Sequence, residues 1–506
     1  AGRTFVNGGV FKSKNTAAYI QDSWSLFSDR LTLNLGVRYD KFTNDNVAGS
    51  TYYDSGDTFA PRLAFAGDPF GDGKTKVYGS FSRYYLPVVA NTNIRLAGAE
   101  LDYTRYNLVA GTNPDNTPIL GAPVLGFADA AACPDTGVRN CDITADGQAT
   151  ATEATVAKNL TPQSVDEYIF GIERNLGNRM RVGVFGQYRQ LNDSLEDVAI
   201  DAAVINYCRA NNLALTNAAG TGCSDIFTGF HQYVLVNPGK ASTITISETL
   251  PGRTGLTTVD FSAADLGYPE IKRTYKAVTA TFDRDFDGTW GVSGSYTWSK
   301  SEGNIEGGIR SDNGQTDSGL TTAFDQPGLT DGAFGPLPGD ATHKFKLFGS
   351  FALTDWLTLG AQGQAISPRK FGCIGRVPVR RDSFAGAYGA AGFYCNVDGS
   401  GNVIVDPQFP GFSNTLAGTS LTLTPRGSIL KSNWNTFLNL SAVIRVPTDA
   451  FDASFRVDAF NVFNQQSVLD LEERGTQVNG APRGDYGSAR AYQAPRFVRF
   501  QLAFGF

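Results

Sequence analysis

Apolar and polar residues alternate along much of this chain, most clearly in its final segment, residues 496–506. One set of alternate positions is apolar and consists of Val498, Phe500, Leu502, Phe504 and Phe506. The positions between them are Arg499, Gln501, Ala503 and Gly505. Successive side chains of a β-strand point to opposite faces, so the pattern predicts a strand with one apolar and one polar face.

The same alternation predicts further strands that are joined in pairs by short turns. The pairs are 15–27 with 31–43, 58–66 with 76–85, 164–175 with 180–191, 274–285 with 290–300, 343–353 with 357–366, and 436–446 with 453–464. The turns contain dipeptides that tight hairpins favour, such as Asp287-Gly288 and Gly177-Asn178. We therefore predict six hairpins and a final strand, about thirteen strands in this chain.

The connections between the hairpins are much longer and are rich in Gly, Asp, Asn, Thr and Pro. They cover residues 86–163, 192–273, 301–342, 367–435 and 465–495. Short turns at one end and long loops at the other are typical of outer-membrane β-barrels, whose strands need only about 9–11 residues to cross the bilayer. The pattern predicts an all-β fold, a transmembrane antiparallel β-barrel with its apolar face in lipid. A soluble all-β protein, whose apolar faces pack against one another, is the alternative.

Strand direction and strand number give further expectations. Long loops are expected outside the cell, and the short turns and the C-terminus in the periplasm. The first strand ends at a short turn, so residues 1–14 are expected to end a preceding extracellular loop and residues 15–506 to form the C-terminal part of a barrel. An odd strand number would leave two unpaired edges in lipid. We therefore expect either one undetected strand or a barrel that continues before Ala1.

Composition narrows the class of protein. The chain has 57 Gly, 35 Phe and 20 Tyr but only 1 Met and 2 His, which fits a β-rich chain with tight turns better than a helical bundle. No stretch approaches the roughly 18 consecutive apolar residues of a membrane helix. The net charge of -6 and the lack of a basic run argue against a nucleic-acid partner. Aromatic residues near strand ends are expected to form interfacial girdles, the alternative being a soluble aromatic core: Tyr84, Tyr85, Tyr296, Trp298, Trp356, Phe500, Phe504 and Phe506.

The six cysteines fall into three local pairs, each inside one long loop. The pairs are Cys133 with Cys141, Cys208 with Cys223, and Cys373 with Cys395. No Cys-x-x-Cys motif occurs, so zinc binding is not expected. We predict three loop disulfides and an oxidising compartment, with free thiols as the alternative. Residues 232–235 and 243–246 are expected to extend barrel strands beyond the membrane.

Other motifs do not indicate enzyme chemistry, metal binding or a cofactor. The Gly71–Thr75 stretch lacks the upstream glycine of a phosphate loop and is predicted to be a hairpin turn. Residues 396–402 resemble a calcium loop but lack the downstream glutamate. His231 and His343 are too few for metal capture by imidazole. A charged set on one hairpin is expected to face the barrel interior: Asp166, Glu167, Glu173, Arg174, Arg181 and Arg189. We expect it to form a solvated inner wall that pairs with a plug, the alternative being the lining of a translocation path.

Several segments resemble TonB-dependent outer-membrane receptors of the Oar-like branch. They are AAYIQDSW at 17–24, DRLTLNLGVRYD at 29–40, FAPRLAF at 59–65, GDGKTKVYGSFSRYY at 71–85 and FRVDAFNVFNQQ at 455–466. The terminal aromatic strand also matches, and Phe506 resembles the signal read by the barrel-assembly machinery. The resemblance covers the strands, not the loops.

The resemblance implies a barrel of about twenty-two strands that houses a plug domain, and this sequence contains neither a recognisable plug nor a TonB box. It also implies active uptake of an unidentified extracellular ligand, with energy from the inner-membrane TonB complex and with loops that capture the ligand. A passive porin-like channel and an adhesive or structural surface barrel are the alternatives. No residue set points to a particular ligand.

Overall fold

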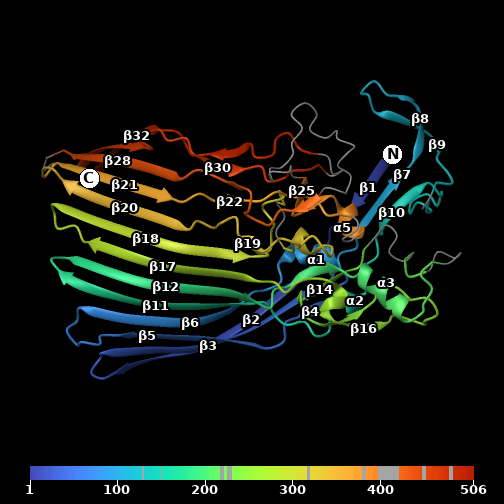
Figure 1. Cartoon of the computed structure of the whole chain (residues 1–506), viewed down its shortest axis with the longest axis horizontal. Coiled ribbons are helices and arrows are strands. Elements are labelled where there is room, and N and C mark those ends of the chain that lie inside the picture. Colours follow the sequence, from blue (N-terminus) through green and yellow to red (C-terminus); the bar gives the residue numbers. More distant parts are fainter. Residues whose placement is uncertain are drawn as a thin grey trace.

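The computed structural model describes the chain except for residues 128–129, 150, 217–221, 225–230, 316–318, 379–382, 397–420, 447–451, 478–481 and 506. Its main feature is one antiparallel sheet of long strands, which we call the wall (Figure 1). The wall strands, in spatial order, are β2 (Ser13–Leu26), β3 (Leu31–Asp45), β5 (Thr58–Gly67), β6 (Thr75–Tyr85), β11 (Ser164–Gly177), β12 (Met180–Asn192), β17 (Arg273–Arg284), β18 (Trp290–Gly303), β20 (His343–Ala352), β21 (Leu357–Ile366), β28 (Asn435–Arg445), β29 (Asp452–Phe460) and β32 (Phe497–Gly505).

These are the thirteen predicted strands, each beside its neighbour in the chain, so the predicted fold class is confirmed. Two short strands join the same sheet, β4 (Thr51–Asp54) on β3 and β19 (Gly335–Pro336) on β18. The tight turns use left-handed backbone, as at Gly177, Asn178 and Arg179, where φ is 83°, 49° and 63°. The Gly71–Thr75 stretch forms the turn between β5 and β6 and the start of β6, as predicted.

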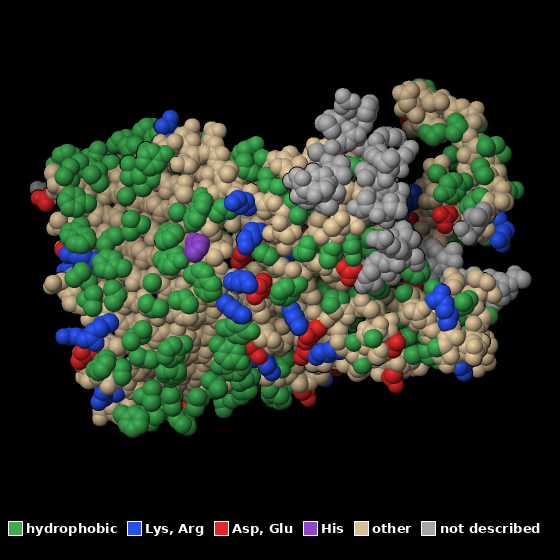
Figure 2. Space-filling model, in the orientation of Figure 1, with side chains coloured by type: hydrophobic (Ala, Val, Ile, Leu, Met, Phe, Trp, Pro, Cys, Tyr) green, Lys and Arg blue, Asp and Glu red, His purple; other side chains and the backbone are tan. Residues whose placement is uncertain are grey.

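Strand register sorts the wall side chains onto an apolar and a polar face. Directly paired positions form a continuous apolar row across five strands: Leu35, Leu63, Phe81, Tyr168 and Tyr188. This row is not a core, since Leu63 and Tyr168 keep 43% and 47% of their surface exposed. Figure 2 shows hydrophobic side chains spread over the sheet, with charged residues gathered at the turn end and where the sheet meets the loops. An apolar surface of this extent requires a lipid or protein cover.

The two end strands of the wall are open edges. Among the described strands, β2 pairs only with β3 and β32 pairs only with β29. Nearly all of β2 and all nine residues of β32 are exposed. The backbone N–H and C=O groups on the outer side of β2 and β32 have no strand partner within the described chain. This agrees with the two unpaired edges that are expected for an odd number of strands.

The long connections, together with β1 (Gly2–Val6), fold into a separate layer at one end of the wall, which we call the cap (Figure 1). It consists of the described residues of 86–163, 193–272, 304–342, 367–434 and 461–496. Its helices are α1 (Ala90–Ala97), α2 (Thr152–Thr155), α3 (Asp201–Ala210), α4 (Ala263–Leu266), α5 (Ser383–Tyr388) and the 3-10 helix η1 (Thr322–Phe324). α4 begins at a capping box of Ser262 and Asp265 and ends at Gly267, whose φ is 79°.

The remaining strands make small sheets inside the cap. One sheet contains β1, β7 (Leu101–Arg105) and β10 (Cys141–Asp146). The two-stranded sheets are β8 (Asn107–Thr112) with β9 (Pro118–Pro123), β13 (Glu196–Ala199) with β14 (Tyr233–Val236), β15 (Ser242–Thr245) with β16 (Thr258–Phe261), β22 (Lys370–Phe371) with β27 (Leu430–Lys431), β23 (Gly375–Arg376) with β24 (Ala390–Gly392), β25 (Tyr394–Asn396) with β26 (Leu421–Leu423), and β30 (Val468–Leu471) with β31 (Ala489–Tyr492). The expectation that 232–235 and 243–246 extend wall strands is therefore wrong, because these segments pair within the cap.

The hydrophobic core of the molecule lies in the cap rather than in the wall. Val198, Ile200, Val234 and Val236 are fully buried in its largest apolar cluster. In the described part of the chain, no helix is long and apolar enough to cross a membrane.

Candidate functional site

Three disulfides each close a loop within one segment of the cap. They join Cys133 to Cys141, Cys208 to Cys223, and Cys373 to Cys395, which are the predicted pairs. The second disulfide ties the end of α3 to the segment around Cys223, and both of its cysteines are fully buried. By closing local loops, these bonds reduce the conformational freedom of segments that carry little periodic structure.

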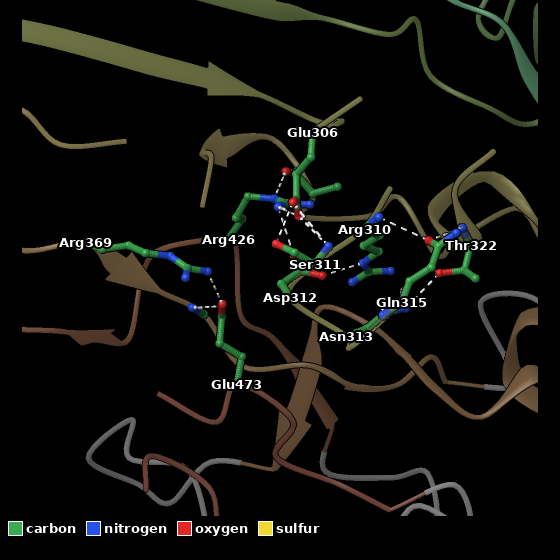
Figure 3. A network of polar contacts seen from close by, with 12 residues as sticks. Glu306, Arg310, Ser311, Asp312, Asn313, Gln315, Thr322, Arg369, Arg426 and Glu473 are labelled. Carbon is green, nitrogen blue, oxygen red and sulfur yellow. Dashed lines mark hydrogen bonds and ion pairs between the residues drawn. The ribbon is translucent and has the colours of Figure 1, made fainter. Parts of the chain in front are cut away.

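A buried set of charges joins the cap segments that follow β18, β21 and β29, and we call it the loop network (Figure 3). At its centre, Arg310 Nε donates to Asp312 Oδ1 at 2.7 Å, and both side chains are only 1% exposed. Arg310 also donates to the backbone carbonyl of Ala391. Burial raises the pKa of Asp312, but Arg310 and Arg426 more than compensate, so its pKa lies below the usual value and it stays ionised.

Arg426 extends the network to a second segment. Its Nη1 lies 2.9 Å from Asp312 Oδ2 and 3.2 Å from Glu306 Oε1, and its Nε donates to the Ala333 carbonyl at 2.9 Å. The ring of Phe393 contacts both guanidinium groups, with centroid distances of 4.9 Å to Arg310 and 5.1 Å to Arg426. Carboxylates and an aromatic face together compensate for the burial of two cations.

Glu473 connects a third segment to the network. Its carboxylate accepts from Arg369 Nη2 at 3.1 Å and from the Gly372 amide at 2.9 Å. Burial, with the nearby charge of Asp312, raises the pKa of Glu473 to about 7. Three loops that emerge from different parts of the wall are thus linked by side chains that include a group whose charge depends on pH near neutrality.

A cavity of about 690 Å³ lies where the cap meets the wall, and we call it the vestibule. The polar face of the wall contributes Arg189, Arg273, Tyr275 and Lys344, and the cap contributes Glu196 among others. The register pairs Arg189 with Tyr275 directly across two strands, which places their side chains on the same face. The vestibule therefore opens between folded loops and the polar side of the sheet.

The vestibule has an excess of positive charge. Arg189 Nε lies 3.2 Å from Glu167 Oε2. Arg273 and Lys344, in contrast, form no ion pair among the described residues, and the carboxylate of Glu306 acts on Arg273 only from beyond ion-pair distance. Glu196 is buried in the cap and accepts from the Thr321 amide at 2.9 Å, and burial raises its pKa well above the usual value, which favours its neutral form. Two cations that form no ion pair within the described part of the chain make the cavity suited to an anionic group.

Nearer the turn end, the polar face carries a second charged cluster. Asp458 accepts from Arg456 Nε at 2.8 Å and from Arg499 Nη2 at 2.7 Å, and its side chain is 5% exposed. These residues help to line a hollow of about 660 Å³ together with Gln362, Asn439 and other polar side chains. A wall of paired charges and amides can remain in contact with water or with a polar partner.

The structure corrects the expectation that all six charged residues on the β11 and β12 hairpin share one face. Four members of the predicted interior set lie on the polar face: Glu167, Glu173, Arg181 and Arg189. Asp166 and Arg174 occupy the opposite face, where Asp166 accepts from Arg83 Nε at 2.7 Å. The prediction treated neighbouring positions alike, although adjacent strand residues must point in opposite directions.

The same alternation separates Tyr84 from Tyr85 in the predicted aromatic girdle. Tyr84 lies on the polar face, with its ring 4.9 Å from the guanidinium of Arg62. His343 lies at a strand start, with Nδ1 2.9 Å from Tyr296 Oη. Phe506 and most of the calcium-like stretch, residues 397–402, lie outside the described residues. The sequence did not identify Arg273 or Lys344 as site residues, because only the cap packing brings them to one cavity.

Comparisons with known proteins agree with this architecture. Residues 41–356, more than half of the chain, match the family model of the outer membrane beta barrel domain. A TonB-dependent transporter, Oar of Myxococcus xanthus, is 27% identical over 98% of this chain and 43% of its own length. This chain thus spans less than half of the length of that relative. The predicted resemblance to Oar-like receptors is confirmed by this similarity.

Solved structures give more distant similarities. The ferripyoverdine receptor of Pseudomonas aeruginosa is 13% identical, with a TM-score of 0.45, over 97% of this chain and 38% of its own. The FrpB iron transporter of Neisseria meningitidis is 10% identical, with a TM-score of 0.45, over 97% of this chain and 45% of its own.

Proposed function

The chain belongs to the outer membrane beta barrel domain family and is a protein of the bacterial outer membrane, and from this premise we propose that it serves TonB-dependent uptake of a ligand. The observation that carries the proposal is the vestibule, where folded loops and the polar face meet around Arg273 and Lys344. A cavity at the mouth of a barrel wall can bind a solute before it passes along the polar face. The two cations favour a ligand with a carboxylate, phosphate or similar anionic group.

The whole protein requires more than this chain describes. We propose that the two open edges, β2 and β32, belong to a larger closed wall whose polar face surrounds a plug. The plug would receive energy from the inner-membrane TonB complex, and the rigid wall would direct its rearrangement. In this arrangement residues 1–14 end an extracellular loop, the cap faces outward, the turns and C-terminus face the periplasm, and Phe506 serves the barrel-assembly machinery.

The vestibule argues against the two other functions. A passive porin needs an open, water-filled path, whereas the cap covers this end of the wall with packed loops. An adhesive surface barrel needs no enclosed cationic cavity on its polar face. Both alternatives predict activity that does not depend on TonB.

Uptake can be tested with an untargeted comparison of bacterial strains. Four strains of the source bacterium would be compared: one with the full-length protein, one in which its gene is deleted, one in which TonB is deleted, and one with the double variant Arg273→Ala and Lys344→Ala. Mass spectrometry would measure which solutes each strain removes from the medium. We expect at least one anionic solute to be depleted by wild type but not by the other three strains.

A matched control is Lys346→Ala, which removes a polar-face cation that is not among the residues lining the vestibule. It should deplete the same solute at the wild-type rate. Solute depletion that persists without TonB would overturn active uptake in favour of a passive channel. An unchanged medium in all strains would favour the adhesive or structural alternative.

A further inference from the structure

The apolar face of the wall contains a hollow of about 790 Å³, which we call the outer groove. Aromatic and aliphatic side chains from neighbouring strands line it, and they include Leu35, Leu63, Phe81, Phe170 and Trp298. The outer groove lies on the side of the wall that contacts lipid in this family.

Two glycines form the floor of the outer groove. Gly79 and Gly186 lie on the apolar face, each directly paired with Phe170 through the register of β11. A Cβ atom at Gly186 would meet only the Ala277 carbonyl at 3.8 Å, so this position faces open space. A Cβ atom at Gly79 would lie 2.7 Å from Phe65 Cε1, so that ring occupies the space a side chain would fill. The outer groove is thus a point on the apolar face, at Gly186, where no side chain fills the space, and aromatic rings form its edges.

A second hollow, of about 730 Å³, adjoins the outer groove toward the cap, and we call it the polar basin. Both hollows share Tyr188 and Lys276 in their linings. Neutral hydrogen-bonding groups line the polar basin together with both signs of charge: Ser55, Thr161, Asn192, Ser194 and Asn237, the cations Arg83, Lys240, Lys272, Arg273 and Lys276, and the carboxylates Asp57, Asp193, Glu270 and Glu302. Three of the carboxylates are paired with lysines, Asp193 with Lys240, Glu270 with Lys272 and Glu302 with Lys300. Along the strand direction toward the cap, the wall therefore presents the outer groove, then Lys276, then the polar basin.

The lysine at the junction has no acidic partner. Lys276 pairs directly across the sheet with Lys300, an arrangement of like charges that is unfavourable by itself. Lys300 Nζ is 2.5 Å from Glu302, whereas Lys276 Nζ has no carboxylate within 4.0 Å among the described residues and lies 5.8 Å from the Tyr188 ring centroid. An exposed cation at the boundary of an apolar surface attracts an anionic lipid headgroup.

We propose that the outer groove and the polar basin bind one phosphorylated glycolipid molecule of the membrane leaflet on the cap side. An acyl chain would lie over Gly186 between the rings, a phosphate would contact Lys276, and the sugar would occupy the polar basin. The size and hydrogen-bonding lining of the basin favour a sugar headgroup over the smaller headgroup of a glycerophospholipid. Lys276 and Gly186 lie on the face of the wall opposite to the polar-face cations of the vestibule.

Native mass spectrometry of the delipidated full-length protein in detergent can test this site. The probes would be lipid A, lipid A without its phosphates, and phosphatidylglycerol. We expect saturable one-to-one binding of lipid A, weakened roughly fivefold by Lys276→Gln and to a similar extent by loss of the phosphates. Gly186→Leu, which fills the groove floor, should also weaken binding.

Two matched variants control for general effects on the wall. Lys346→Gln removes a lysine from the polar face, and Gly363→Leu adds a side chain elsewhere on the apolar face. Both should bind lipid A as wild type does, and circular dichroism should show unchanged strand content in all four variants. Equal binding by every variant would overturn the site. Equal or tighter binding of phosphatidylglycerol would overturn the glycolipid assignment, and neither result bears on TonB-dependent uptake.

Discussion

The wall and the cap place the same kinds of residue in opposite environments. Leu502 in β32 is 67% exposed, whereas Leu235 in β14 is 0% exposed. In the wall, apolar side chains point away from the protein and alternate with polar ones. In the cap, they gather into a water-excluding core of the ordinary soluble kind. The wall is therefore built to expose its apolar side chains to lipid, whereas the cap is stabilised by burying its apolar side chains away from water.

Charged residues show the reverse contrast. The wall keeps most of its charges on the polar face or near its ends, where water can reach them. Asp22 departs from this pattern, because it lies on the apolar face of the edge strand β2, directly paired with Leu35. The cap buries Arg310, Asp312 and Arg426 almost completely. We therefore expect charge substitutions to destabilise the cap most when they remove a buried partner, and the wall most when they add a charge to its apolar face.

The largest effect is expected from Asp312→Asn in the cap. Arg310 would lose its carboxylate partner while still buried, at a cost of about 3–5 kcal/mol. Hydrogen exchange should show opening of the segment that follows β18 while the wall amides stay protected. Asp470→Asn is the control, because Asp470 also pairs with an arginine, at 2.7 Å, but is 42% exposed. If both variants behave alike, the network does not hold the cap.

The next largest effect is expected from Leu347→Arg at the centre of the apolar face. A cation at the bilayer midplane of a barrel costs about 2–4 kcal/mol, so the midpoint of urea unfolding in lipid vesicles should fall. Gln362→Arg, on the polar face of the neighbouring strand β21, should leave the midpoint nearly unchanged. Equal shifts in the two variants would contradict the assignment of the faces.

Glu473→Gln should change how the stability of the cap depends on pH. The folded-state pKa of Glu473 is raised from 4.5 to about 7, so its contribution is fully present below pH 4.5 and is lost as pH rises through about 7. Far above pH 7 the wild-type cap should be less stable than the glutamine variant by an amount on the order of 3 kcal/mol. Hydrogen exchange in the cap at pH 5, 7 and 8 would measure this difference. If hydrogen exchange in the wild-type cap became slower as pH rises, this would contradict the raised pKa of Glu473.

The smallest effect is expected from Lys76→Ala on the polar face. Lys76 Nζ lies 3.8 Å from Glu173 Oε2, with the two side chains 54% and 34% exposed. Such solvated pairs contribute roughly 0–1 kcal/mol. Vesicle unfolding should therefore barely shift, and a large loss of stability would mean that polar-face charges support the wall more than their exposure indicates.

The wall could be predicted from the sequence because its repeat is local. Alternation at residues 31–43 already separates the two faces of β3, and the turn residues fix where each hairpin reverses. The same alternation places Asp166 and Arg174 on the face opposite to Glu167 and Glu173, so the faces of these residues also follow from their sequence positions.

The cap could not be predicted in the same way. Residues 232–235 are predicted from the sequence to extend the wall, but β14, residues 233–236, pairs with β13 within the cap. Arg310 has no local feature that distinguishes it from a solvated arginine. The face of Lys344 follows from alternation, whereas its meeting with Arg273 in the vestibule depends on how non-periodic loops pack.

The loop network has a mechanical consequence. Glu306 pairs with Arg426, and Glu473 pairs with Arg369 of the same cap segment as Arg426, so ion pairs join three segments that follow different wall strands. Displacement of one of these segments would therefore pull on the other two, so the three are expected to move as one unit rather than independently.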